Sequence, residues 1–249
     1  MKHFIYLCSL FTLSFAALQC SSPPPTVLEE IYQNMVSVKG GTFMMGSNDY
    51  TAYKWEKPAH RVTVGDFQIS KYQVTQKQWE EVMGDNPSFF KHKDLPIESV
   101  SWNDVQQFIQ KLNELTGKNY RLPTEAEWEF AARGGQNSMK FNFAGSNMIG
   151  EVAWYKNNSD NCTHFVGAKR KSNEMGLYDM SGNVWEWCND WYGTYTTAAQ
   201  TDPQGPETGT TRVIRGGSWC HDARSCYVSY RSSADPDKKT NNIGFRLCL

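Results

Sequence analysis

Three segments of the chain repeat apolar residues at helical spacing, and each follows a hydroxyl residue that has a glutamine or an acid three positions later. These hydroxyl residues are Thr75, Ser101 and Thr124. Such a capping box satisfies free N–H groups of a first helical turn, so a helix is predicted after each of them. Gly84 and Gly134 predict the ends of the first and third helices. The second helix has an apolar face at i, i+3, i+4 and i+7, formed by Val105, Phe108, Ile109 and Leu112.

Short strands are predicted before the first helix. Residues 36–46 have the pattern of two strands on either side of a Gly-Gly pair, and residues 58–64 alternate like a third strand. Beyond Gly134, glycines, tryptophans and isolated acids follow one another with no helical or strand period. We therefore predict one α+β domain over residues 35–249 with much irregular structure. Long irregular regions in compact domains normally carry function on their loops.

Residues 1–20 have the features of a secretory signal peptide. Lys2 and His3 precede an apolar run that is too short to span a membrane, and the run ends at Cys20. A cysteine there, followed by serines and prolines, is typical of a bacterial lipoprotein. We expect export, lipidation of Cys20 and exposure of the domain at the cell envelope; the alternative is an ordinary cleaved signal. Three prolines within residues 21–34 predict a tether.

Composition restricts the partners. The 249 residues carry a net charge of -1, so no broad attraction to nucleic acid is expected, and we expect a monomer that binds a protein or a glycan. Aromatic residues make up 14% of the chain although its mean hydropathy is -0.60, which favours a core of packed rings. Once Cys8 and Cys20 are set aside, five of the seven cysteines remain. One disulfide is plausible in an oxidising compartment, and no cysteines have zinc-site spacing.

Five short motifs occur in order along the chain, at residues 40–46, 121–129, 182–187, 215–219 and 244–246. Their sequences are GGTFMMG, RLPTEAEWE, GNVWEW, RGGSW and GFR. Together they resemble the sulfatase-modifying factor family, to which the formylglycine-generating enzymes belong. The resemblance spans nearly the whole chain beyond the signal peptide, and it implies a C-type-lectin-like fold.

The resemblance also raises the question of catalysis. The family's enzymes oxidise a sulfatase cysteine with oxygen and a copper ion held by two cysteines. Cys226 matches the second of these, whereas His221 matches the first and Cys220 comes one residue early. Copper(I) favours a pair of thiolates, and a one-residue slip in an extended segment turns a side chain to the opposite side. One alternative is a copper site formed by Cys226 with either Cys220 or His221 as the second ligand. The other is a structural Cys226, which packs in the core or forms a disulfide with Cys188. We favour the structural role for Cys226, and ligand binding over catalysis for the protein.

A calcium site is a second feature that the resemblance implies. Its oxygen ligands correspond to Asp179, Gly182, Val184 and Glu186, and such hard oxygen ligands suit calcium. The ion would have a structural role in holding loops. The alternative is that Asp179 caps a turn and that Glu186 pairs with an arginine.

Residues 215–246 resemble the C-terminal variable region of proteins diversified by retroelements, which include treponemal variable surface lipoproteins. Residues that look fixed alternate there with small polar residues. In such proteins the adenines of a template copy of the gene are randomised, and the polar residues seen here can arise from asparagine codons in that way. Two alternatives remain. The region is an ordinary solvated loop, or the protein is an envelope component whose sequence does not vary. The predicted ligand-binding residues are Cys220, His221, Asp222, Ser225, Tyr227, Ser229, Ser232, Ser233, Ala234 and Asp235.

Overall fold

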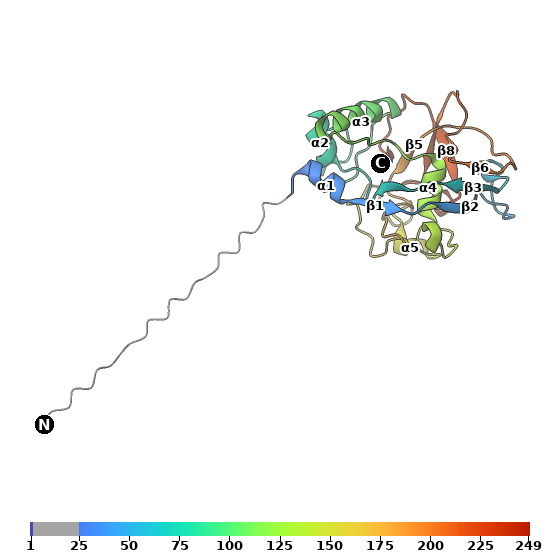
Figure 1. Cartoon of the computed structure of the whole chain (residues 1–249), viewed down its shortest axis with the longest axis horizontal. Coiled ribbons are helices and arrows are strands. Elements are labelled where there is room, and N and C mark those ends of the chain that lie inside the picture. The colour runs from blue at the N-terminus through green and yellow to red at the C-terminus, as the bar shows by residue number, and fades with distance from the viewer. Residues whose placement is uncertain (2–24) are drawn as a thin grey trace.

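The computed structural model describes residue 1 and residues 25–249 (Figure 1). Lys2 to Cys20 of the predicted signal peptide, the lipidation site and the first residues of the tether lie outside the described residues. Helices and short strands alternate with long loops, which confirms the α+β prediction. The helices are α1 Val27–Gln33, α2 Gln76–Met83, α3 Trp102–Thr116, α4 Glu125–Ala132 and α5 Ile149–Val152, and the 3-10 turns are η1 Lys54–Glu56, η2 Gly135–Asn137 and η3 Ala223–Cys226.

The predicted tether is too long at its C-terminal end. Thr26 and Glu29 form a capping box that starts α1, and Ile31 is buried in the core beside α2 and α3. Lys77 on α2 forms a salt bridge of 3.0 Å with Glu30. The folded domain therefore begins at Thr26, nine residues before the predicted boundary at residue 35.

The three helices predicted from capping boxes are all present. Thr75, Ser101 and Thr124 each accept a hydrogen bond from the backbone N–H three residues later, in front of α2, α3 and α4. Gly84 ends α2 in the left-handed conformation. The four predicted apolar residues of α3 are all buried.

Within residues 25–249, nine strands form three small sheets. They are β1 Met35–Val38, β2 Gly41–Met45, β3 His60–Val64, β4 Phe67–Ser70, β5 Trp185–Trp191, β6 Gln200–Thr201, β7 Arg212–Arg215, β8 Arg231–Ala234 and β9 Ile243–Gly244. The sheet orders are β1-β4, β2-β3-β6 and β8-β7-β5-β9. The predicted strands on either side of the Gly-Gly pair exist, but they pair with β4 and β3 and not with each other. Gly40 lies where the chain passes between the two sheets, and a Cβ there would come within 2.3 Å of the Val64 carbonyl oxygen.

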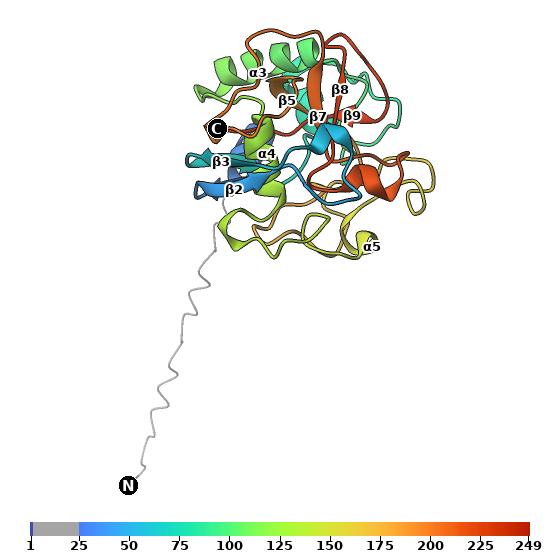
Figure 2. The same ribbon diagram turned by 90° about the vertical axis from the view of Figure 1, so that its right-hand side faces the viewer.

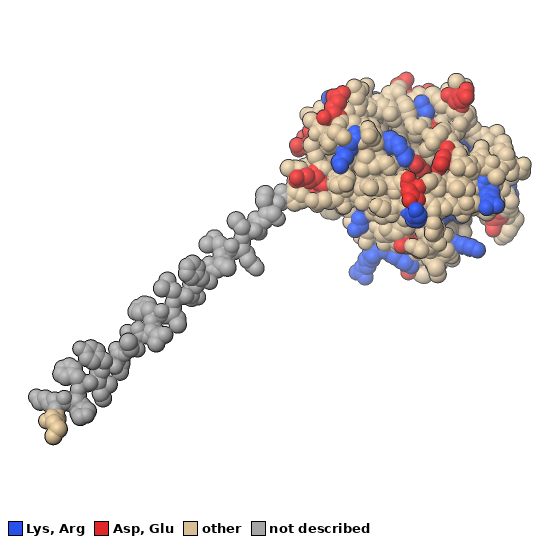
Figure 3. All heavy atoms as spheres, in the orientation of Figure 1, with Lys and Arg blue, Asp and Glu red and all other residues tan. Residues whose placement is uncertain are grey.

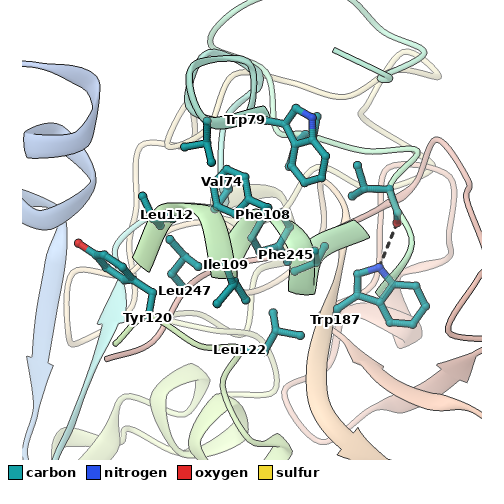
Figure 4. Close-up of a cluster of buried hydrophobic side chains, with 14 of the residues drawn as sticks. Val74, Trp79, Phe108, Ile109, Leu112, Tyr120, Leu122, Trp187, Phe245 and Leu247 are labelled. Carbon is teal, nitrogen blue, oxygen red and sulfur yellow. Dashed lines mark hydrogen bonds between the residues drawn. The ribbon is translucent and has the colours of Figure 1, made fainter. Parts of the chain in front are cut away.

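Packed aromatic rings form much of the core, as the composition predicts (Figure 4). The rings of Trp79 and Phe108 stack at 5.2 Å, and Phe245 meets Phe108 edge to face at 5.3 Å. Trp187 is fully buried and donates its indole N–H to the carbonyl oxygen of Val100 at 3.2 Å. The C-terminal motif is thereby fixed against α2 and α3.

Buried ion pairs tie the irregular C-terminal third to the rest of the fold. Arg246 contacts both oxygens of Glu186 at 2.6 and 2.8 Å, and neither side chain is exposed. Arg231 forms a similar two-pronged contact with Glu125 at 2.7 and 2.6 Å. A bidentate arginine–carboxylate pair fixes the relative orientation of the two side chains and also neutralises their charges. Because Arg246 and Arg231 are used inside the fold, they are not available to an external ligand.

The outer surface carries mixed charge. Acidic and basic side chains are interspersed over the side seen in Figure 3. Within residues 25–249 no helix is long and apolar enough to cross a membrane.

Candidate functional site

The middle of the predicted variable region, at β8, lies on the side of the domain away from α1. In Figure 1, α1 is at the left, where the described chain begins, whereas β8 lies toward the right. Figure 2 looks onto that side and shows β7, β8 and β9 close to the viewer. The region leaves β7 at Arg215, passes η3, returns through β8 and ends in β9. β8 is the edge strand of its sheet.

Nine of the ten predicted binding residues are half-buried or exposed, and they fall in two groups that we call the binding face. The group around η3 is Cys220, His221, Asp222, Ser225 and Tyr227, and the group on β8 and beyond it is Ser232, Ser233, Ala234 and Asp235. Asp222 and Asp235 are the most exposed of them. Between the two groups, Val228 is buried. Of the residues that look fixed in the sequence, Val228, Arg231 and Phe245 are buried. Ala223, Arg224 and Tyr230 also look fixed but are half-buried, like most of the binding face.

Ser229 does not belong to the binding face. Its side chain is buried, and its hydroxyl donates a 2.8 Å hydrogen bond to Glu56. Glu56 also pairs with Arg224. Ser229 thus satisfies a buried carboxylate, and its assignment as a ligand-binding residue is corrected here.

Cys220 has an unusual environment for a thiol. Its sulfur lies 3.4 Å from the Ser218 hydroxyl, 3.4 Å from His221 Nδ1 and 3.3 Å from the side-chain nitrogen of Asn242. Partial burial raises the pKa of Cys220, but the hydrogen bonds from His221, Ser218 and Asn242 outweigh it and lower the pKa to about 7. Much of this thiol is a thiolate at neutral pH, and thiolates are the nucleophilic form.

Cys226 has the opposite character. It is fully buried beside Phe143 and Val152, and burial raises its pKa to about 12. Gly217 covers it so closely that a Cβ there would lie 2.7 Å from the sulfur. A thiol that the backbone covers so closely is poorly placed to bind copper(I) together with a second ligand.

The predicted cysteine pairs are also not formed. Cys188 and Cys226 are both buried free thiols, and the other cysteines among residues 25–249 are also free. Within the same residues no three His, Cys, Asp or Glu side chains gather as a metal-binding group. The described residues therefore do not fit the copper ion that the resemblance implies, and Cys226 packs as a small apolar residue.

Three of the four residues expected to bind calcium come together around a side-chain amide. The Nε2 of Gln73 donates to the carbonyl oxygen of Val184 at 2.9 Å, to Glu186 Oε1 at 2.9 Å and to the carbonyl oxygen of Asp179 at 3.3 Å. Gly182 shapes the turn, with φ of 84° and no space for a Cβ. The amide nitrogen thus lies at the point where these oxygens converge.

The charges at this turn are largely balanced without a cation. Glu186 is neutralised by Arg246 and accepts a further hydrogen bond from the Trp128 indole at 2.6 Å. Asp179 accepts from the backbone N–H of Gly167 at 2.7 Å, its Oδ1 is buried without a hydrogen-bond partner, and burial raises its pKa to about 6. The unpaired Oδ1 of Asp179 would suit a cation. The centre of the cluster, however, holds the side-chain amide of Gln73 and the carboxylate of Glu186, whose charge Arg246 already neutralises. The residues present do not fit the calcium ion that the resemblance implies.

With this geometry described, comparison with known proteins identifies the scaffold. Residues 22–249 match the model of the sulfatase-modifying factor enzyme 1-like domain. The chain belongs to the sulfatase-modifying factor family. It is 29% identical to a formylglycine-generating enzyme of Thermomonospora curvata, over 88% of this chain and 94% of that enzyme.

Two other similar proteins have names that do not describe an oxidase. A protein of Paenibacillus barcinonensis named chaperone protein LppX is 34% identical over 92% of both chains. The solved structure of Treponema denticola variable protein 1 superposes with a TM-score of 0.80 at 32% identity, over 86% of this chain and 94% of that one. The expected resemblance to variable proteins on this lectin-type scaffold is thereby confirmed.

The thiol environments predict selective alkylation. At pH 7 in the native state, iodoacetamide should modify Cys220 about tenfold faster than an unperturbed thiol, because far more of it is thiolate. Cys188, Cys226 and Cys248 should react only after unfolding, and the half-buried Cys162 provides an internal comparison. Mass spectrometry of tryptic peptides measures all five rates. Fast native alkylation of Cys226 would contradict the account and favour a copper pair.

The Gln73 amide predicts folding without calcium. The thermal midpoint of the wild-type protein should be the same with calcium as with a chelator. Replacement Gln73→Glu removes three donated hydrogen bonds and adds a charge beside Glu186, so it should lower the free energy of unfolding by about 2 kcal/mol or more. Calcium should reverse that loss, because a cation then replaces the amide.

A matched control for this experiment is Gln78→Glu, since glutamine and glutamate serve equally in the capping box of α2. That variant should behave like wild type with and without calcium. A rise of several degrees in the wild-type midpoint on adding calcium would show that the cluster binds the ion.

Proposed function

We propose that this protein is a ligand-binding protein displayed on the cell envelope, and that the binding face recognises a protein or a glycan. The supporting observation is that some side chains within residues 215–246 are buried and hold the fold, while others are at least partly exposed. Exposed polar residues lie directly beside residues that are buried and fixed by ion pairs, such as Arg215 and Arg231. Side chains on such a backbone vary at little cost to the fold.

The chemistry of the binding face suits a binder. Tyrosine, serine, aspartate and histidine give adaptable polar contacts with modest loss of side-chain entropy, as they do in antibody loops. A rigid backbone lowers the cost of ordering on binding. The similarity to Treponema denticola variable protein 1 over most of both chains adds support from the scaffold.

The position of the binding face also suits display. It lies away from α1, whose first turn follows Cys20 by only a few residues (Figure 1). If Cys20 carries the lipid, α1 stays near the membrane and the binding face points outward. Export and anchoring are part of the proposal.

Copper-dependent oxidation receives less support. A catalytic copper pair needs both Cys226 and Cys220 or His221 as ligands, and Cys226 is fully buried and closely covered by Gly217. The reactive thiol of Cys220 alone does not provide two soft ligands.

Sequencing of the DNA that flanks the gene tests the proposal. We expect a near-copy of the codons for residues 215–246 that differs from the gene only where the copy carries adenine. The differences should fall on the codons of the binding face and spare those of Val228 and Arg231, since these two side chains are buried. A gene with no such copy, and with the same binding face in independent isolates, would favour an envelope component of fixed sequence.

A further inference from the structure

A cavity of about 320 Å³ is lined by Arg231 of β8 but by none of the ten predicted binding residues. It is bounded by β3, the first turn of α4, the end of β5 and the loop of residues 193–206. Four ionisable side chains that line it are each at least nine-tenths buried: His60, Glu125, Asp190 and Arg231. Ionisable groups are rarely placed around an open cavity without partners of their own.

Two of the four are fully compensated within the protein. Glu125 accepts from Arg231 through both oxygens and from the Tyr195 hydroxyl at 3.1 Å. Arg231 also donates to the carbonyl oxygen of Gly193 at 2.7 Å and lies over the Tyr195 ring at 3.9 Å. This pair needs nothing from a ligand.

Asp190 is only half satisfied. Its Oδ2 accepts the backbone N–H of Glu125 at 2.9 Å, whereas its Oδ1 receives no hydrogen bond from any described residue. Oδ1 lies close to Gly205 in the cavity wall, since a Cβ on Gly205 would lie 3.3 Å from it. Asp190 is thus a buried residue that lines the cavity and has one carboxylate oxygen without a donor among the described residues.

The electrostatics at Asp190 call for a positive charge. Burial raises the pKa of Asp190 to about 8, the neighbouring Glu125 carboxylate adds to the rise, and Arg231 only partly opposes it. The other charged or titratable groups near Asp190 are Glu127 on α4, Arg212 on β7 and His60 on β3. Without a bound cation, Asp190 holds a proton at neutral pH.

The rest of the wall is suited to an alkyl chain. Met45, Trp191, Pro203 and Pro206 line the cavity together with the Tyr195 ring. The polar end of the cavity and its apolar walls together match a small molecule with one charged end.

We propose that this cavity binds a small primary alkylammonium ion, whose ammonium group donates to Asp190 Oδ1 while its alkyl chain packs against Trp191 and Tyr195. This site is independent of the binding face. Because the ligand displaces the proton of Asp190, binding releases close to one proton at pH 7.

Titration with n-butylammonium chloride, followed by calorimetry in two buffers of different ionisation enthalpy, tests the proposal. We expect millimolar binding that releases a proton, strengthens almost tenfold from pH 6 to 7 and about fivefold from pH 7 to 8, and then levels off. Neutral 1-butanol, of the same shape, should bind at least tenfold more weakly.

Asp190→Asn keeps an oxygen for the Glu125 N–H and removes the charge, so n-butylammonium binding should fall at least tenfold and lose its pH dependence. Glu207→Gln, an exposed acid outside the cavity, serves as the matched control and should bind like wild type. Equal binding of n-butylammonium and 1-butanol, no proton release, or no binding to the wild type would each overturn the proposal. These wild-type measurements decide the matter even if Asp190→Asn does not fold.

Discussion

Buried arginine–glutamate pairs are the interaction on which the C-terminal half of this protein depends. That half has little regular structure, so ladder hydrogen bonds between strands hold only part of it. Instead arginines reach inward to glutamates on distant elements: Arg246 to Glu186, Arg231 to Glu125, Arg215 to Glu129 and Arg224 to Glu56. Removing one partner of a buried pair typically costs 3–5 kcal/mol, which is a large part of the total stability of a domain.

These pairs separate the framework of the protein from its surface. Arg231 and Val228 are held inside, whereas their neighbours Ser232 and Tyr227 are half-buried. The chain shares its family with the formylglycine-generating enzymes. In this chain the thiol at residue 226 is covered, and an amide from Gln73 holds the turn at which calcium was expected.

Sequence reasoning succeeded where the decisive contacts are local and failed where they are distant. The capping boxes at Thr75, Ser101 and Thr124 bond three residues ahead, so the helices were predictable. Gln73 and Glu186 are 113 positions apart and Ser229 and Glu56 are 173 apart, and no local pattern reports such contacts. The short helix α1 was also missed, because the prolines before it led to the prediction of an extended tether over the same residues.

The free energy of unfolding of a four-site variant tests the separation of framework and binding face most directly. The variant carries Asp222→Asn, Ser225→Asn, Ser232→Asn and Ser233→Asn together, and Arg246→Met is measured beside it by urea denaturation. We expect the four-site variant to stay within about 1 kcal/mol of wild type, since all four side chains are at least partly exposed, and Arg246→Met to lose about 3–5 kcal/mol. A four-site variant that loses as much as Arg246→Met would show that the binding face is part of the core.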